Sequence, residues 1–309
     1  MSFALVLHGG AGSPPPGTLD AATEARRCEV LRAALDAGTA ILAAGGSALD
    51  AVVAAVVVLE DDPVFNAGRG SVYATDHTQR MDASVMHGPT RRAGAVCDVR
   101  RIRNPIEAAR AVAQCSPHVL LAGPGAEAFA ARQGLPLVDP RHFADRARLD
   151  QLAQAVAAGR IVLDHSASVP EEAGGTVGAV ARDRSGQLAA ATSTGGMTGK
   201  APGRVGDSAI IGAGTWADHT CAVSATGHGE RFIEAHVAGR IALLMELSGL
   251  SLHDATHRVV HTELPRFLAE GGIIAVDAHG HIAWPYNSGG MARACRTIDG
   301  QIQVHGLST

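Results

Sequence analysis

Hydrophobic and polar positions follow two different periods along this 309-residue chain, and the periods predict its elements. Residues 3–7 are a short apolar run typical of a buried strand, which ends in the glycine-rich turn 8–12. Apolar residues then recur at helical spacing over about 20–44. A second helix is expected from Ala48 to about Glu60, and because it is apolar nearly all round, it should be buried between layers.

The rest of the chain is predicted to alternate hairpins with helices. Hairpins are expected at 71–86, 176–193 and 273–286, and helices after Asn104-Pro105 and over about 231–247 and 252–264. The strict β-α-β order of a parallel sheet is missing. We therefore expect an α/β layered sandwich of antiparallel sheets with helices packed outside. The charged segment over about 136–175 is expected to hold a central helix and a flexible tail, or to be an ordinary surface loop.

Composition indicates a folded globular protein, with 46% hydrophobic and 18% charged residues. The net charge is −4 and no basic stretch is interleaved with aromatic residues, which argues against nucleic acids and anionic membranes as partners. The longest apolar run, 51–59, is too short to span a bilayer. The N-terminus lacks the basic region of a signal peptide, and the five cysteines include no C-x-x-C pair. We expect a cytoplasmic protein in a reducing compartment.

The hairpin at 176–193 brings two hydroxyl groups together if its turn centres on Ser185. Thr176 and Thr194 then lie opposite each other on one face, with Cβ atoms about 5 Å apart. A register slip of one residue would place them on opposite faces, so the inference depends on that register.

Thr176 follows Gly174-Gly175, where a reactive peptide bond could be held. A threonine hydroxyl becomes a useful nucleophile when its own free α-amino group, with a pKa of roughly 7.7–8.0, acts as its base. In the middle of a chain this requires cleavage between Gly175 and Thr176, by attack of the hydroxyl on the Gly175 carbonyl. The alternative is that Thr176 is an ordinary strand residue after a loop.

Two further segments carry candidate binding groups. Arg204 and Asp207 lie three residues apart in a glycine loop and could hold the carboxylate and ammonium groups of an amino acid. Thr226 and Gly227 precede a predicted helix and could stabilise an oxyanion. The simpler alternatives are a surface Arg–Asp pair and a helix N-cap at Thr226.

Taken together, these segments resemble the plant-type asparaginase/isoaspartyl peptidase family of N-terminal-nucleophile (Ntn) hydrolases. The resemblance covers nearly the whole chain in the right order and is carried by HGGAG (8–12), DPVFNAGRG (62–70), Asn104-Pro105, GTVGAVA (175–181), ATSTGGMT (191–198), PGRVGDS (202–208) and SATGHGE (224–230).

The resemblance implies a single Ntn-hydrolase domain over 1–309 with a four-layer αββα sandwich of two mostly antiparallel sheets. It implies self-cleavage into 1–175, with a flexible C-terminal linker over about 140–175, and 176–309. The expected reaction is hydrolysis of β-aspartyl dipeptides and of L-asparagine. The implied catalytic residues are Thr176, Thr194, Thr226 and Gly227, and the implied substrate-binding residues are Arg204, Asp207, Gly229 and Asn66.

No cofactor is implied for catalysis, but a structural sodium ion is. Its ligands would be the backbone carbonyls of Leu59, Glu60, Asp62, Phe65, Ala67 and Arg69. The active form is expected to be a homodimer of cleaved units acting on small molecules. Two alternatives stay open: a related enzyme acting on glycosylated asparagine, and an uncleaved, catalytically silent binding protein of the same fold.

Two other patterns are weaker candidates for function. His257 and His261 have the i,i+4 spacing that can bind zinc, but no third ligand is evident, and an exposed helix face is the simpler interpretation. The HGGAG segment after a strand suggests a dinucleotide loop, but it lacks the G-x-G-x-x-G pattern.

Overall fold

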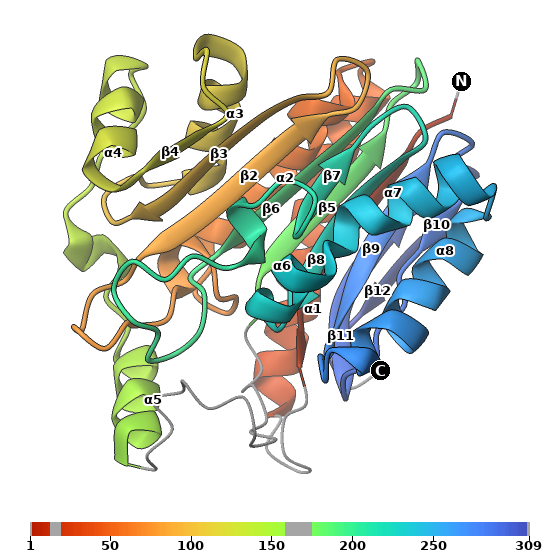
Figure 1. The fold of residues 1–309 in the computed structure, drawn as a ribbon. Helices are drawn as coiled ribbons and strands as arrows, with labels where there is room; N and C mark the ends of the chain where they lie inside the picture. The colour runs from red at the N-terminus through yellow and green to blue at the C-terminus, as the bar shows by residue number, and fades with distance from the viewer. Residues whose placement is uncertain (1, 13–19, 158–174, 308–309) are drawn as a thin grey trace.

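The computed structural model describes residues 2–12, 20–157 and 175–307. Its larger sheet has eight strands in the order β12-β11-β1-β5-β6-β2-β3-β4 (Figure 1). These strands are β1 (Ala4–Gly12), β2 (Met81–His87), β3 (Arg92–Val99), β4 (Leu120–Ala122), β5 (Val177–Arg182), β6 (Leu188–Thr194), β11 (Gly290–Arg296) and β12 (Ile302–His305).

The smaller sheet has four strands in the order β10-β9-β8-β7. They are β7 (Thr215–Ala217), β8 (Cys221–Gly227), β9 (Gly271–Asp277) and β10 (Ile282–Ala283). Every pair of neighbouring described strands is antiparallel except β3–β4, which is parallel. The prediction of an α/β protein with mostly antiparallel sheets is confirmed.

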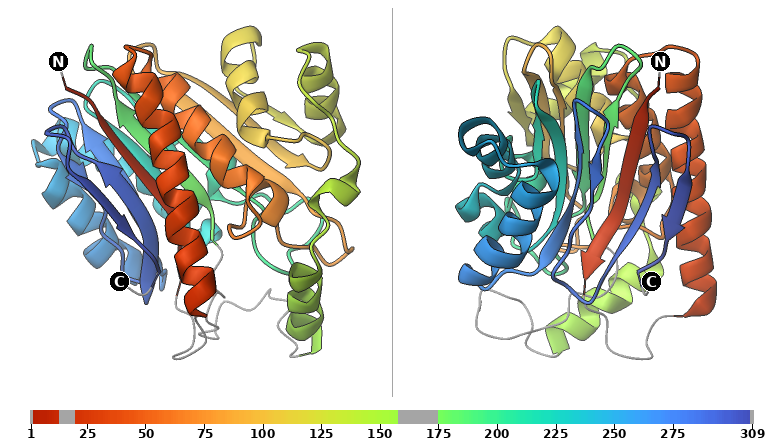
Figure 2. Two further views of the ribbon diagram at one scale, coloured as in Figure 1. Left: turned by 180° about the vertical axis from the view of Figure 1, so that it is seen from behind. Right: turned by 90° about the vertical axis from the view of Figure 1, so that its right-hand side faces the viewer.

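The two sheets pack face to face, with β1, β5 and β6 against β8 and β9. The outer face of the larger sheet is covered by α1 (Ala21–Ala43), α2 (Ala48–Asp61) and α3 (Pro105–Cys115). The outer face of the smaller sheet is covered by α7 (Val237–Ser248) and α8 (Leu252–Arg258). Figure 2 shows α1 and α8 on opposite sides of the pair of sheets.

The helix starts follow the sequence signals. Ser47 caps α2 by accepting a hydrogen bond from the Asp50 amide, and Pro105 lies in the first turn of α3. The remaining helices are α4 (Gly123–Arg132), α5 (Arg146–Ala157), α6 (Gly229–Ala235) and α9 (Leu264–Arg266). No helix within the described ranges is long and apolar enough to cross a membrane.

Three sequence expectations need correction. The hairpin at 71–86 is reduced to a single bridge between Tyr73 and Gln79, because β2 pairs with β3 and β6 instead. The helix at 231–247 is divided into α6 and α7 by His236, whose backbone is left-handed with φ of 52°. The helix at 252–264 changes to a π-helical turn over Val259–Glu263.

The segment over 140–175 is described as far as residue 157, and it contains a helix, as expected for its middle. Residues 140–157 form a short 3₁₀ helix, Pro140–Phe143, followed by α5, and they bury Phe143 and Leu152. Residues 158–174 of the expected linker lie outside the described residues.

Candidate active site

The face of the larger sheet that meets the smaller one changes from apolar to polar along its strands. At one end it is formed by residues such as Val6, Val180 and Ala190, which belong to the apolar core between the sheets. At the other end the same face is lined by residues that carry polar groups or leave room for them: His8, Asp82, Ser84, Thr176, Gly178, Thr192 and Thr194. The candidate nucleophile therefore lies where the core between the sheets becomes polar.

Thr176 and Thr194 meet at this polar end. In the β5–β6 hairpin, Val177 pairs with Ser193 and Gly178 with Thr192, so the predicted register is confirmed. Thr176 lies just before the first of these pairs, and its Oγ1 donates a hydrogen bond to Thr194 Oγ1 at 3.1 Å. Thr194 Oγ1 also accepts from the Gly196 amide at 2.9 Å. Thr194 thus orients the Thr176 hydroxyl and is itself held in place by the following loop.

Gly175 is enclosed by backbone and by Thr226. A Cβ atom built on Gly175 would lie 3.1 Å from Thr226 Oγ1 and 3.1 Å from Gly10 Cα. Thr226 Oγ1 in turn accepts a hydrogen bond from the Ala11 amide at 3.2 Å. The residue before Thr176 therefore lies against Thr226 and the β1 glycine turn. Gly227 ends β8 directly after Thr226.

Arg204 already holds a carboxylate in the free protein. Its Nε and Nη2 each donate to Glu230 at 2.8 Å, which is the bidentate geometry expected of an arginine–carboxylate pair. Burial alone would raise the pKa of Glu230, but the hydrogen bonds and charge of Arg204 outweigh it and lower the pKa to about 2. The Arg204 fork can therefore hold a carboxylate, and Glu230 is the one it holds here.

Gly229 brings Arg204 and Asp207 together. A Cβ atom built on Gly229 would lie 2.8 Å from Arg204 Nη2 and 3.1 Å from Asp207 Oδ1. Asp207 is buried at 3% exposure at the start of a short 3₁₀ helix, Asp207–Ala209. Gly196 lies between this pair and the Thr176–Thr194 pair. Its amide donates to Thr194 Oγ1, and a Cβ atom built on it would lie 3.2 Å from Arg204 Nη1. The predicted groups converge on one site.

Asn66 lies behind the loop that follows Thr194. Its side chain donates to the Gly196 carbonyl at 2.6 Å and accepts from the Val72 amide at 3.0 Å, while its own carbonyl accepts from the Gly195 amide. The structure therefore places Asn66 beside Thr194 as a support for the loop.

Comparisons with known proteins show the family to which the chain belongs. Residues 1–305 match the protein family described as Asparaginase. The chain belongs to this asparaginase family. It is 52% identical to the isoaspartyl peptidase of Salmonella typhimurium over 94% of each chain. It is 50% identical to the isoaspartyl peptidase of Escherichia coli K12, covering 94% of this chain and 91% of the relative. It is 44% identical to the plant-type L-asparaginase of Pyrobaculum calidifontis, covering 94% and 95%.

In this asparaginase-family chain, sequence reasoning missed two groups in and around the site. Glu230 was seen only as part of a glycine motif, because no local pattern pairs it with Arg204, which lies 26 positions earlier. Two buried residues of opposite charge, Asp82 and Lys200, both interact electrostatically with Arg204. Burial raises the pKa of Asp82 and lowers that of Lys200, and the charge of each opposes the shift of the other. Asp82 also pairs across the sheet with Thr194.

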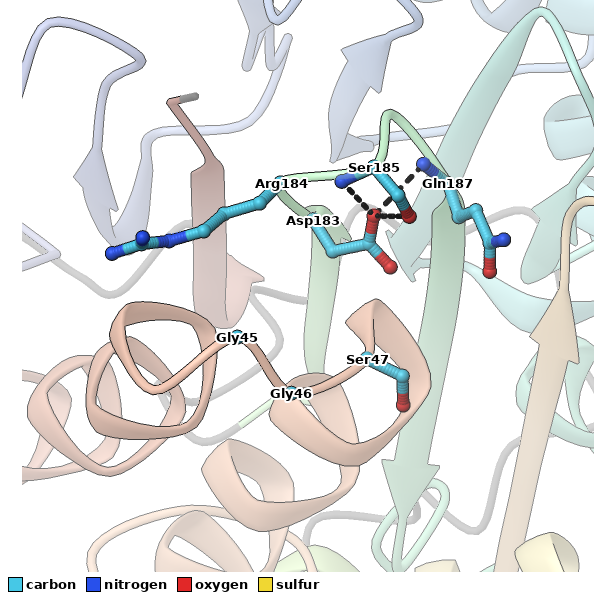
Figure 3. A pocket seen from close by; sticks show the side chains of 7 residues that line it. All are labelled: Gly45, Gly46, Ser47, Asp183, Arg184, Ser185 and Gln187. Atoms are coloured by element: carbon cyan, nitrogen blue, oxygen red, sulfur yellow. Dashed lines mark hydrogen bonds between the residues drawn. The ribbon is translucent and has the colours of Figure 1, made fainter.

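Two other places in the molecule are separate from this site. A cavity of about 320 Å³ lies at the β5–β6 turn and is lined by Ser47, Asp183 and Gln187 among others (Figure 3). The 6 residues of β5 separate it from Thr176, which at ~3.3 Å per strand residue is about 20 Å. The Asp183 carboxylate is already hydrogen-bonded to the Ser185, Gln187 and Ala48 amides, which indicates a structural role.

His257 and His261 are exposed, with ring centroids 4.4 Å apart. Within the described ranges no group of three or more His, Cys, Asp or Glu side chains is arranged to hold a metal ion. All five cysteines are free.

Proposed function

We propose that this protein cleaves its own chain before Thr176 and then hydrolyses β-aspartyl dipeptides and L-asparagine with Thr176 as its nucleophile. The observation that carries the proposal is the 3.1 Å hydrogen bond from Thr176 Oγ1 to Thr194 Oγ1, next to a glycine peptide enclosed by Thr226. The names of the relatives, isoaspartyl peptidase and plant-type L-asparaginase, support the choice of substrates.

Self-cleavage would use the groups around Gly175. Thr176 Oγ1 attacks the Gly175 carbonyl carbon, the peptide C–N bond breaks, and the proton passes to the new amine. An ester then joins Gly175 to Thr176 Oγ1, and water hydrolyses it. The products are a carboxylate on Gly175 and a free α-amine on Thr176. This amine is the base that the hydroxyl needs for further turnover.

In the cleaved enzyme the same hydroxyl would attack the side-chain carbonyl of the substrate. Asp207 would bind the α-ammonium group, and Arg204 would bind the α-carboxylate by sharing or exchanging its hold on Glu230. Thr226 and the Gly227 amide would stabilise the oxyanion. Ammonia or an amino acid leaves, and water hydrolyses the β-aspartyl ester. Thr194 keeps the hydroxyl oriented through both steps.

Several further properties belong to the same proposal. Two sheets packed face to face between outer helices support the four-layer αββα sandwich of Ntn hydrolases. A homodimer of cleaved units would cover exposed leucines on α7, Leu243 and Leu247. A cytoplasmic location fits the five free cysteines.

The proposed sodium site fits the end of α2 and the following loop. The last carbonyls of a helix have no partner within the helix, and carbonyl oxygens are hard ligands suited to such a cation. A Cβ atom on Gly68 would lie 2.3 Å from the Glu60 carbonyl oxygen, so the loop folds closely over that carbonyl. The carbonyls of Leu59, Glu60, Asp62, Phe65, Ala67 and Arg69 would hold the ion, which would supply a fixed positive charge that stabilises the loop.

The decisive experiment compares the wild-type protein with Thr176→Ala and Thr176→Ser. Intact-mass analysis of the wild type should give fragments of 175 and 309 − 175 = 134 residues, whereas Thr176→Ala should remain one chain of 309 residues. Thr176→Ser keeps a hydroxyl and should still cleave.

The cleaved wild type should release ammonia from L-asparagine and hydrolyse a β-Asp-Leu dipeptide. Cleavage of Thr176→Ala, or hydrolysis of these substrates by an uncleaved wild type, would refute the proposal. A folded wild type that neither cleaves nor hydrolyses either substrate would support the silent binding protein.

A further inference from the structure

A continuous chain of side-chain hydrogen bonds crosses the interface between the two sheets beside the active site. His8 Nε2 lies 2.9 Å from Ser224 Oγ, and Ser224 Oγ lies 2.7 Å from Thr192 Oγ1. Thr192 Oγ1 lies 2.6 Å from Thr215 Oγ1, which lies 2.8 Å from Ser84 Oγ. All five residues are fully buried. They come from β1, β8, β6, β7 and β2, so the chain passes back and forth between the sheets.

One end of this chain lies next to Thr176. A Cβ atom built on Gly178 would lie 2.4 Å from His8 Nε2 and 2.0 Å from Ser224 Oγ. The first hydrogen bond of the chain therefore passes directly over β5, two residues after the candidate nucleophile, and it needs glycine at 178.

The other end holds the turn that carries Asp207. Ser84 Oγ donates to the Ser208 carbonyl at 2.6 Å, and Thr192 Oγ1 donates to the Gly214 carbonyl at 3.2 Å. The Gly214 amide in turn donates to the Asp207 carbonyl at 3.1 Å. The chain thus links the start of β5 to the residue proposed to bind the substrate ammonium group.

The five protons of the chain satisfy five of its six contacts at a time, because Ser84 has one proton for both the Ser208 carbonyl and Thr215. A carbonyl oxygen only accepts, so Thr192 donates to Gly214, and Thr215 donates to Thr192. Ser224 then donates to Thr192, and His8 must donate to Ser224 from Nε2. This order leaves His8 Nδ1 without a proton, and that atom has no hydrogen-bond partner among the described residues. Burial lowers the pKa of His8 to about 3, against a smaller opposing effect of the Thr176 backbone, so the ring stays neutral.

We propose that this chain, from His8 to Ser84, is a positioning element that fixes the start of β5, and with it Thr176, relative to the Asp207 turn. The inference rests on the proposed function. The five residues act through Thr176 and Asp207 rather than on the substrate. The two ends of the chain have separate effects: the His8–Ser224 end sets the placement of the nucleophile, and the Ser84–Thr215 end sets the placement of the ammonium-binding carboxylate.

The test of the nucleophile end uses Ser224→Ala together with two changes at position 8. Ser224→Ala leaves a buried N–H of His8 without an acceptor, and we expect self-cleavage and kcat to fall about tenfold while KM changes less than about twofold. In His8→Gln the side-chain amide can reach the place of Nε2 and keep the bond to Ser224, so it should restore most of the activity. The shorter His8→Asn cannot reach Ser224 and should behave like Ser224→Ala.

The test of the other end uses Thr215→Val. Valine has nearly the same shape as threonine but lacks the hydroxyl. Here we expect KM for L-asparagine to rise about three- to tenfold, with kcat close to the wild-type value. Thr192→Val cuts the middle of the chain and should change both kcat and KM. If Ser224→Ala does not fold, Thr192→Val tests the nucleophile end in its place.

The control is Thr256→Val, because Thr256 is also buried and its hydroxyl donates to the His253 carbonyl on α8, away from the chain. Thermal unfolding of each variant measures its general loss of stability. The inference is overturned if folded Ser224→Ala cleaves and turns over like the wild type. It is also overturned if Thr256→Val lowers kcat as much, or if His8→Gln is as impaired as His8→Asn. A wild type that neither cleaves nor hydrolyses asparagine would instead refute the proposed function.

Discussion

Replacing Gly10 with alanine should slow self-cleavage about a hundredfold without unfolding the protein. A Cβ atom at Gly10 would lie 2.6 Å from both Cα and N of Gly175, closer than real Cβ contacts allow. Gly175 would have to move by about 1 Å, and a displacement of that size at reacting groups costs on the order of 10²-fold in rate. Gly10 also has φ of 103°, which adds about 1–2 kcal/mol of backbone strain for alanine.

Gly45→Ala is the control that separates the effect of the contact with Gly175 from the effect of backbone strain. Gly45 has φ of 86° at the end of α1, and a Cβ atom there would meet nothing within 4 Å. Both variants should therefore carry about 1–2 kcal/mol of backbone strain, but Gly45→Ala lacks the contact with Gly175 and should cleave at the wild-type rate.

The assay is a time course of intact mass on freshly purified protein, with thermal unfolding measured in parallel. A folded Gly10→Ala variant that cleaves as fast as Gly45→Ala would show that the packing of Gly10 on Gly175 does not control the reaction.

Two further predictions concern Arg204 and Glu230. Arg204→Ala should raise KM for L-asparagine by roughly 10- to 100-fold, because a bidentate, charge-assisted hydrogen bond to the substrate carboxylate is lost. The KM of Arg204→Lys should fall between those of the wild type and Arg204→Ala. Steady-state kinetics on cleaved protein measures these values, and an unchanged KM would show that Arg204 does not bind the substrate. Because the pKa of Glu230 is lower in the folded protein, its pairing stabilises the fold above about pH 4.5 and is lost as the pH falls toward 2. Glu230 is 35% exposed, so solvent screening reduces this contribution to about 1 kcal/mol. The unfolding temperatures of the wild type and Glu230→Gln should therefore differ by a few degrees at pH 7, differ less at pH 3 and converge near pH 2, and a constant difference would contradict the pairing.

The elements that local sequence determines were the ones that could be predicted. The register of the β5–β6 hairpin follows from the turn at Ser185 alone, and it correctly placed Thr176 opposite Thr194. The starts of α2 and α3 follow from Ser47 and Pro105. By contrast, no local pattern shows that β1 lies between β5 and β11, because that placement depends on strands far apart in the chain.

The active-site roles were suggested by motifs, but several supporting residues escaped sequence reasoning. Ser224, Thr192 and Thr215 are single polar residues in strands, and each alone is an ordinary strand residue. They form a chain only because two sheets bring them face to face. The pairing of Arg204 with Glu230 likewise depends on α6 packing beside the Asp207 turn.

The strand order explains how the fold can tolerate the proposed scission. The strands of the two fragments alternate in groups across the larger sheet. The fragment before the cut contributes β1 and the group β2, β3 and β4. The fragment after the cut contributes β5 and β6, which lie between those two groups, and β11 and β12, which lie on the other side of β1. Each fragment is therefore held by strand pairing on three boundaries with the other: β11–β1, β1–β5 and β6–β2. In addition, α2 of the first fragment packs on β5 and β6 of the second. A cut before Thr176 breaks none of these pairings, because it falls where β5 begins. The sheet can thus present a new chain end in its active site while the interleaved strands keep that end in place.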